Sequence, residues 1–141
     1  MKTNVCLVLV LFLSMQSCKN ESKETKEETR MERVMAVHDE LMPKMSTIGK
    51  LISSLEPKID STEAGLKYKV AKDDLVASYD FMMDWMKGFG DRFDSEEIME
   101  GKALSPEKET WLLEEEEKVN TMKDMMLQSI DNAKALLPKE E

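Results

Sequence analysis

Histidine, glycine, cysteine and aromatic residues are all scarce in this sequence of 141 residues. The chain has one His, five Gly, two Cys and 6% aromatic residues. This composition leaves little material for a zinc site, a catalytic triad or a glycine-rich phosphate loop. The motifs of metalloproteases, serine hydrolases and haem attachment do not occur in the sequence either. We therefore expect a protein that is not an enzyme and needs no cofactor.

Positive charge is in the minority. The chain has 20 Lys and Arg against 29 Asp and Glu, which gives a net charge of −9. Nucleic-acid binding depends on clustered Lys and Arg that neutralise phosphates, so we expect no nucleic-acid partner. The length corresponds to one compact domain.

Residues 1–17 have the pattern of a signal peptide. Lys2 provides a short basic start, and residues 5–13 (VCLVLVLFL) form an unbroken apolar run. A run of this length suits the apolar region of a signal peptide and is too short to span a bilayer. Ser17 and Cys18 follow at the point where the hydrophobicity falls.

A small residue directly before a Cys, at the end of a short apolar run, resembles the lipobox of bacterial lipoproteins. In that family Cys18 becomes the first mature residue; its thiol carries a diacylglyceryl group and its amine a third acyl chain. Each buried CH2 contributes about 0.8 kcal/mol, so several chains anchor a protein stably. The alternative is an ordinary secretory signal that leaves Cys18 as an unmodified thiol. Cys6 leaves with the signal peptide, so no internal disulfide is expected.

Residues 18–29 are predicted to be the lipidated cysteine and a charged tether. Residues 19–29 (KNESKETKEET) contain no apolar side chain. Such a segment buries too little surface to offset the entropy of ordering, so it stays solvated. The alternative is that its charge pairs extend the next helix outward. In both cases the segment spaces residues 30–138 from the membrane.

Residues 30–138 show helical periodicity, with three helices expected at about 30–56, 62–87 and 106–137. In the first, apolar positions recur at alternating steps of four and three, which is a coiled-coil seam. This seam consists of Val34, His38, Leu41, Met45, Ile48, Ile52 and Leu55. Pro57 is expected to end the first helix, and Gly88 with Gly90 the second. Ser105 and Pro106 form a strong start signal for the third.

The second and third helices are expected to carry similar apolar faces. That of the second consists of Tyr68, Ala71, Leu75, Tyr79, Met82, Met86 and Phe89. No alternating apolar run indicates a strand. The sequence therefore predicts an all-α protein, an antiparallel three-helix bundle with coiled-coil-like packing after the signal peptide.

A Met-rich segment surrounds the single histidine. Met35, His38 and Met42 share one helix face. An antiparallel turn centred near Asp60 places His38 level with Met82, and Met35 level with Trp85. A second turn centred near Glu97 places Met83 near Trp111, so one end of the bundle is expected to collect these side chains.

Three interpretations of this cluster stay open. Thioether and imidazole ligands suit Cu(I) or Ag(I), with His38, Met42, Met82 and Met86 as candidate ligands and copper as the alternative cofactor. The same residues suit core packing, which is the favoured interpretation because Met fills irregular gaps and contacts aromatic rings. A Met-rich partner surface is the third, with Met35, Trp85 and Trp111 as candidate contacts.

The four glutamates at residues 114–117 form the densest charge in the chain. Ca2+ sites need several oxygens that converge from a loop, whereas these side chains point around a helix. A solvated face with one Glu near the seam is the expected arrangement.

Two segments, HDELMPKMSTIGKL (residues 38–51) and YDFMMDWMKGF (residues 79–89), resemble a family of small lipoproteins of Flavobacteriia and related Bacteroidota. Some of its members carry the label "viral A-type inclusion protein". The resemblance implies an outer-membrane location, with the bundle on the periplasmic or surface face, and implies no activity. We expect a membrane-anchored lipoprotein that acts as a non-catalytic binding or structural module of the cell envelope. Its expected partners are the membrane and another envelope protein.

Overall fold

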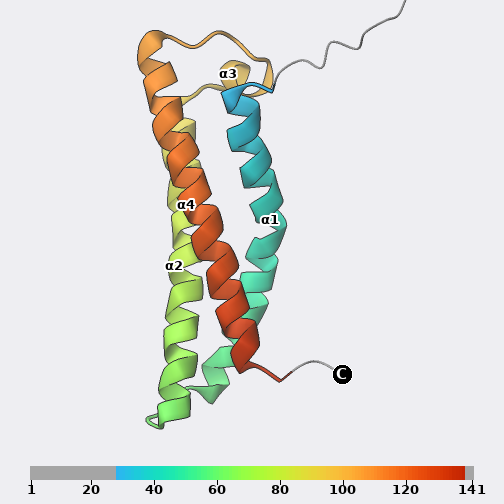
Figure 1. The fold of residues 1–141 in the computed structure, drawn as a ribbon, viewed down its shortest axis with the longest axis vertical. Helices are drawn as coiled ribbons and strands as arrows, with labels where there is room; N and C mark the ends of the chain where they lie inside the picture. Colours follow the sequence, from blue (N-terminus) through green and yellow to red (C-terminus); the bar gives the residue numbers. More distant parts are fainter. Residues whose placement is uncertain (1–27, 139–141) are drawn as a thin grey trace, which may run out of the picture.

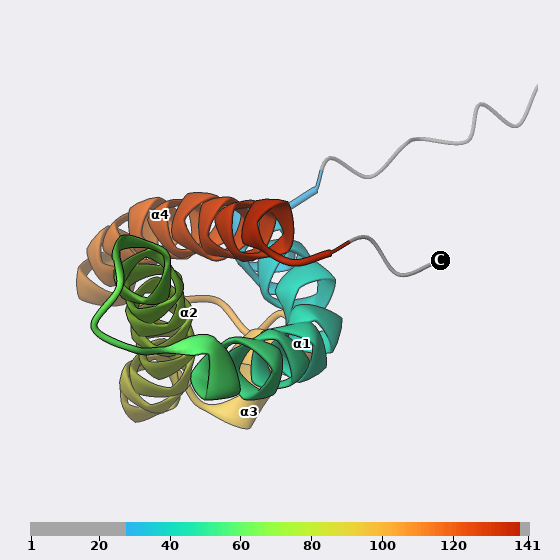
Figure 2. The ribbon, with the colours of Figure 1, turned by 90° about the horizontal axis from the view of Figure 1, so that it is seen from below.

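Three long helices and two short helical segments make up residues 28–138, the part of the chain that this computed structural model describes. In chain order these are α1 (Arg30–Leu55), the 3-10 turn η1 (Glu56–Lys58), α2 (Glu63–Arg92), the short α3 (Ser95–Met99) and α4 (Pro106–Leu136). The long helices stand side by side (Figure 1) and surround a common axis when viewed along it (Figure 2). The predicted all-α bundle of three long helices is confirmed.

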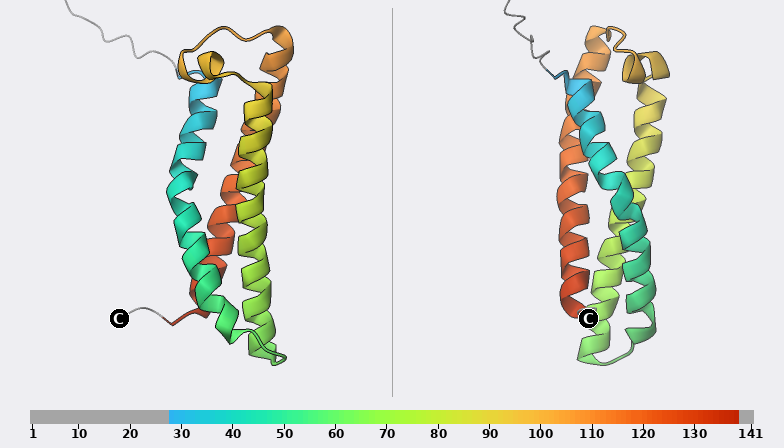
Figure 3. Two further views of the ribbon diagram at one scale, coloured as in Figure 1. Left: turned by 180° about the vertical axis from the view of Figure 1, so that it is seen from behind. Right: turned by 90° about the vertical axis from the view of Figure 1, so that its right-hand side faces the viewer.

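The long helices run down, up and down along the bundle. The chain enters α1 beside α3, turns at η1, returns through α2, and descends again through α4 (Figure 3). We call the two ends of the bundle the α3 end and the η1 end. Helix α4 is therefore parallel to α1 and antiparallel to α2, and each of the three packs on both of the others.

Side-chain caps fix where the helices start. The hydroxyl of Thr29 accepts a hydrogen bond from the backbone N–H of Glu32 at 3.2 Å, and the Glu32 carboxylate accepts one from the N–H of Thr29 at 2.7 Å. This reciprocal pair is a capping box. Ser105 caps α4 with a single hydrogen bond, which its hydroxyl accepts from the backbone N–H of Lys108 at 3.3 Å, and Pro106 is the first residue of the helix. The start predicted at Ser105 and Pro106 is confirmed.

Helix α2 is longer than predicted. Gly88 and Gly90 do not end it; the helix continues to Arg92. Both glycines are exposed, and each costs a helix about 1 kcal/mol relative to alanine. The extra turn buries Phe89 and leads Phe93 into the core. Phe89 is 4% exposed and Phe93 is 3% exposed. Burying two aromatic rings outweighs the cost of two glycines.

The core follows the predicted seams closely. Every residue of the predicted α1 seam is buried or partly buried, and Val34, Leu41, Ile48 and Leu55 are fully buried. In α2 the prediction was wrong at Tyr79, which is 38% exposed. The small Ser78 takes the inward position instead, and its hydroxyl lies 3.0 Å from that of Ser129 on α4. A pair of serines lets α2 and α4 approach more closely at this level than a tyrosine ring permits.

One carboxylate interrupts the α4 seam. Glu115 is 2% exposed, and it accepts hydrogen bonds from Arg92 and Lys118, both at 2.8 Å. A buried charge is costly unless it is paired, and two cations satisfy this one. The expectation that one residue of the glutamate run lies near the seam is confirmed.

The next glutamate in the run joins α4 to α1. Glu116 accepts from Arg30 at 2.9 Å and from Arg33 at 3.0 Å. Desolvation of Glu116 raises its pKa, but the hydrogen bonds from Arg33 and Arg30 outweigh this effect and hold the pKa below that of an ordinary glutamate. This ion-pair group ties the first turns of α1 to α4 at the α3 end.

Candidate functional site

The candidate lipidation site, Cys18, lies outside the described residues, as does most of the predicted tether. Within residues 28–138, no helix combines the length and the hydrophobicity that crossing a bilayer requires. The described chain enters the bundle at the α3 end through Glu28 and Thr29.

The single histidine begins a row of four rings in contact, of which Trp85 and Phe89 are stacked and the other two pairs are tilted. The ring of His38 lies 5.6 Å from that of Trp85, which lies 4.8 Å from Phe89, which in turn lies 4.8 Å from Phe93. The Nδ1 atom of His38 lies 3.0 Å from the carboxylate of Asp39. Ring contacts at these distances are favourable. The contact between His38 and Trp85 joins α1 to α2, and the other two lie along the C-terminal part of α2.

The predicted alignment of the helices needs correction. His38 lies beside Trp85 rather than level with Met82, a displacement of about one helical turn. Met83 was expected near Trp111, yet the Trp111 ring lies under the guanidinium of Arg92, 5.6 Å away. The second difference follows from the extension of α2 to Arg92, which places the turn between α2 and α4 later in the chain than predicted.

The candidate metal ligands and partner contacts differ in burial. Met82 is fully buried and Met42 is 40% exposed, while Met35 and Met86 are partly buried against the core. Trp85 is 5% exposed, and its indole N–H has no hydrogen-bond partner within the described chain. Met82 and Trp85 are therefore packed core side chains, and Met35 and Met86 border the core, whereas Met42 lies on the surface.

Within residues 28–138, no group of three or more His, Cys, Asp or Glu side chains lies close enough together to hold a metal ion. The copper interpretation, which depends on the thioethers of Met42, Met82 and Met86, stays a prediction.

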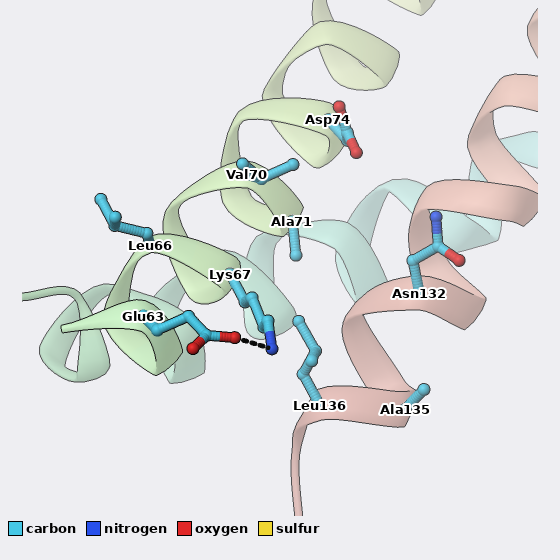
Figure 4. A pocket seen from close by; sticks show the side chains of 9 residues that line it. All are labelled: Glu63, Leu66, Lys67, Val70, Ala71, Asp74, Asn132, Ala135 and Leu136. Carbon is cyan, nitrogen blue, oxygen red and sulfur yellow. Dashed lines mark hydrogen bonds and ion pairs between the residues drawn. The ribbon is translucent and has the colours of Figure 1, made fainter.

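An open apolar groove lies between α2 and α4 near the η1 end (Figure 4). It has a volume of about 570 Å3, and Leu66, Val70 and Leu136 are among the apolar residues that line it. Leu66 is 52% exposed and Val70 is 60% exposed. An ion pair between Glu63 and Lys67, 2.8 Å long, forms part of the rim.

The groove continues along the two helices into a smaller and more polar pocket. Asp74 and Asn132 line both, and Ser78 and Ser129 lie in the smaller one. Small residues also line these pockets, Ala71 and Ala135 in the first and Ala77 in the second. We call the whole surface the α2–α4 groove. Side chains this small allow another backbone to come close to both helices.

This groove was not predicted, although the sequence contains a signal for it. Leu66 and Val70 are four residues apart in α2 and therefore share a face, but neither belongs to the predicted apolar face of that helix. Apolar pairs outside the seam of an amphipathic helix indicate a surface for something beyond the bundle.

The chain matches no protein-family model, no curated protein and no solved structure. The resemblance to small lipoproteins therefore stays a prediction.

Proposed function

We propose that this protein is a lipid-anchored, non-catalytic binding module of the bacterial cell envelope. The observation that carries the proposal is the order of the first 29 residues: an apolar run of signal-peptide length, Ser17 and Cys18, and then a charged segment without apolar side chains. In this proposal Cys18 holds the acyl chains in the outer membrane and the charged segment spaces the bundle from the surface.

The shape of the bundle supports this arrangement. The chain enters α1 at the α3 end, and the α2–α4 groove lies towards the opposite end (Figures 1 and 4). Helix α4 has 31 residues, and at 1.5 Å per residue it is about 46 Å long. An anchor at the α3 end therefore holds the groove tens of ångströms from the membrane, within reach of another envelope protein.

The partner that best fits the groove is an amphipathic helix. Two helices form its walls, small residues line it, and Leu66 and Val70 project from its rim without cover from the rest of the described chain. An apolar stripe of a third helix buries such a surface with anchors at helical spacing. Polar residues at the upper part, Asp74 and Asn132 among them, offer hydrogen bonds that set its position.

Replacing Cys18 with alanine is expected to abolish acylation. Cells are fed an alkyne-bearing fatty acid, and the label on the purified protein is measured together with its distribution between membrane and soluble fractions. The diacylglyceryl group is attached through the thiol of Cys18 in this proposal, so the Cys18→Ala variant loses nearly all label. Cys6→Ala is the matched control and keeps the label, because Cys6 lies within the apolar run. Full labelling of Cys18→Ala contradicts the lipid anchor.

Contact through the groove is tested with a photo-crosslinking amino acid at Val70. Val76, on the same helix and 37% exposed, is the matched control because it does not line the groove. We expect one discrete crosslinked product from position 70 in intact cells and none from position 76. The product should also disappear when Leu66→Lys is introduced, since a lysine places a charge in the apolar contact. Equal crosslinking from both positions contradicts the groove as the contact surface.

A further inference from the structure

A cleft lined by lysines opens between the C-terminal ends of α1 and α4, at the η1 end. Its volume is about 820 Å3. Lys50, Lys58 and Lys134 line it together with the apolar side chains of Leu51 and Leu137. A binding site for a small ligand has a volume of about 300–1,000 Å3, so this cleft falls within the usual range.

The three lysines have no anionic partner within residues 28–138. Most Lys and Arg side chains of this part form ion pairs. The described cations without an ion pair are Lys44, Lys50, Lys58, Lys87 and Lys134. Three of these line one cleft, and no carboxylate lines it, although acidic residues outnumber basic ones in the chain. Positive charge is therefore concentrated at a single concave place.

The cleft also has an apolar part, formed by Leu51 and Leu137. Leu51 is 9% exposed and belongs to the core, and Leu137 is partly buried against the core. Cations beside an apolar lining suit a ligand with an anionic head and a hydrocarbon tail, because the head gains charge-assisted hydrogen bonds while the tail leaves water.

The helix dipole explains part of this pattern. Lys58 and Lys134 lie in the last turns of η1 and α4, where the partial negative charge of a helix end favours a cation. Lys50 lies in the body of α1, more than a turn before the end of that helix. Neither its position nor the apolar lining follows from the dipole.

We propose that this cleft binds a single-chain anionic amphiphile. The carboxylate or phosphate head lies among Lys50, Lys58 and Lys134, and the hydrocarbon chain covers Leu51 and Leu137. This site is separate from the α2–α4 groove, and it does not depend on the anchoring proposed for Cys18.

The test titrates dodecanoate, and dodecyl phosphate in parallel, into residues 19–141. All described helices and buried side chains lie within this fragment. The methyl NMR signals of Leu51 and Leu137 are expected to shift in a saturable way with at least one of the two ligands. Replacing Lys50, Lys58 and Lys134 together with glutamine is expected to weaken binding about tenfold, because three charged contacts are lost. The matched control, Lys44→Gln with Lys87→Gln, removes unpaired lysines elsewhere and should change the affinity by less than about twofold.

Several outcomes overturn the proposal. They are the absence of any saturable shift with either ligand, an unchanged affinity in the triple variant, and equally tight binding of acetate, which has no tail. Equally tight binding of dodecyltrimethylammonium, which has the opposite charge, overturns it as well. If the triple variant melts at a lower temperature than the original chain, the single variants Lys50→Gln and Lys134→Gln are compared instead. Weaker binding of the amphiphile by either single variant supports the proposal. Unchanged binding by both overturns it.

Discussion

Replacing Leu75 with alanine is expected to lower the free energy of unfolding by about 2–5 kcal/mol. Leu75 is fully buried in the middle of α2, in the core that all three long helices share. Its truncation removes apolar contacts and leaves a cavity that the neighbouring helices close only in part. The measurement is urea unfolding of residues 19–141, followed by circular dichroism at 222 nm.

Leu113→Ala is the matched control for this change. Leu113 lies in α4 and is 48% exposed, so the same truncation leaves no cavity in the core. We expect the free energy of unfolding to change by less than about 1 kcal/mol. Similar losses for the two variants are incompatible with a core in which Leu75 is enclosed by three helices.

Replacing Gly65 with alanine is expected to destabilise the protein by about 1–3 kcal/mol, the usual range for an overpacked site. Gly65 lies in the first turn of α2, directly against the turn that precedes the helix. A Cβ atom at this position comes within 2.5 Å of the backbone N and 2.7 Å of the backbone O of Asp60. The turn cannot easily move away, because the Asp60 carboxylate accepts a hydrogen bond from the backbone N–H of Thr62 at 2.9 Å and Thr62 caps α2.

Gly88→Ala is the control, and it is expected to raise the stability where Gly65→Ala lowers it. Gly88 lies in the same helix, and a Cβ atom there meets nothing within 4 Å. Alanine favours a helix over glycine, so this variant should gain about 0.5–1 kcal/mol. Thermal melting of the two variants beside the original chain tests the pair. A rise in melting temperature for Gly65→Ala contradicts the close packing of Asp60 on α2.

Periodicity predicted the bundle well because burial dominates the energetics of each long helix. Apolar residues at steps of three and four define one face, and only that face can be buried when three helices surround one axis. The α1 seam from Val34 to Leu55 is accordingly buried or partly buried throughout. The helix starts were also predictable at Ser105 and Pro106, where capping is local and independent of the tertiary fold.

The end of α2 and the alignment of Trp111 were predicted wrongly, because tertiary contacts overrode the local preference of the sequence. Gly88 and Gly90 favour a helix end, but the burial of Phe89 and Phe93 extends α2 past both of them. The extension changed the position of the second turn and with it the alignment of Trp111. A local pattern cannot show such a shift, because it contains no information on which aromatic rings another helix will cover.

The surface features were the hardest to predict. The α2–α4 groove and the cleft lined by lysines are each formed by residues far apart in the chain, such as Val70 with Leu136 and Lys50 with Lys134. A helical pattern shows that these side chains point outward, but not which of them become neighbours. That depends on the rotation of each helix about its own axis, which the core packing sets.

The opposite positions of the two chain ends have a mechanical consequence. The described chain begins at the α3 end and finishes at the η1 end, and α1 and α4 run in the same direction (Figure 1). A force that pulls these two ends apart loads the helices in shear, so many interlocked side chains have to slip at once instead of peeling away pair by pair. Resistance to such a force is governed by the rate of unfolding, not by equilibrium stability. A bundle anchored at the α3 end and loaded at the η1 end is therefore pulled along its helix axes.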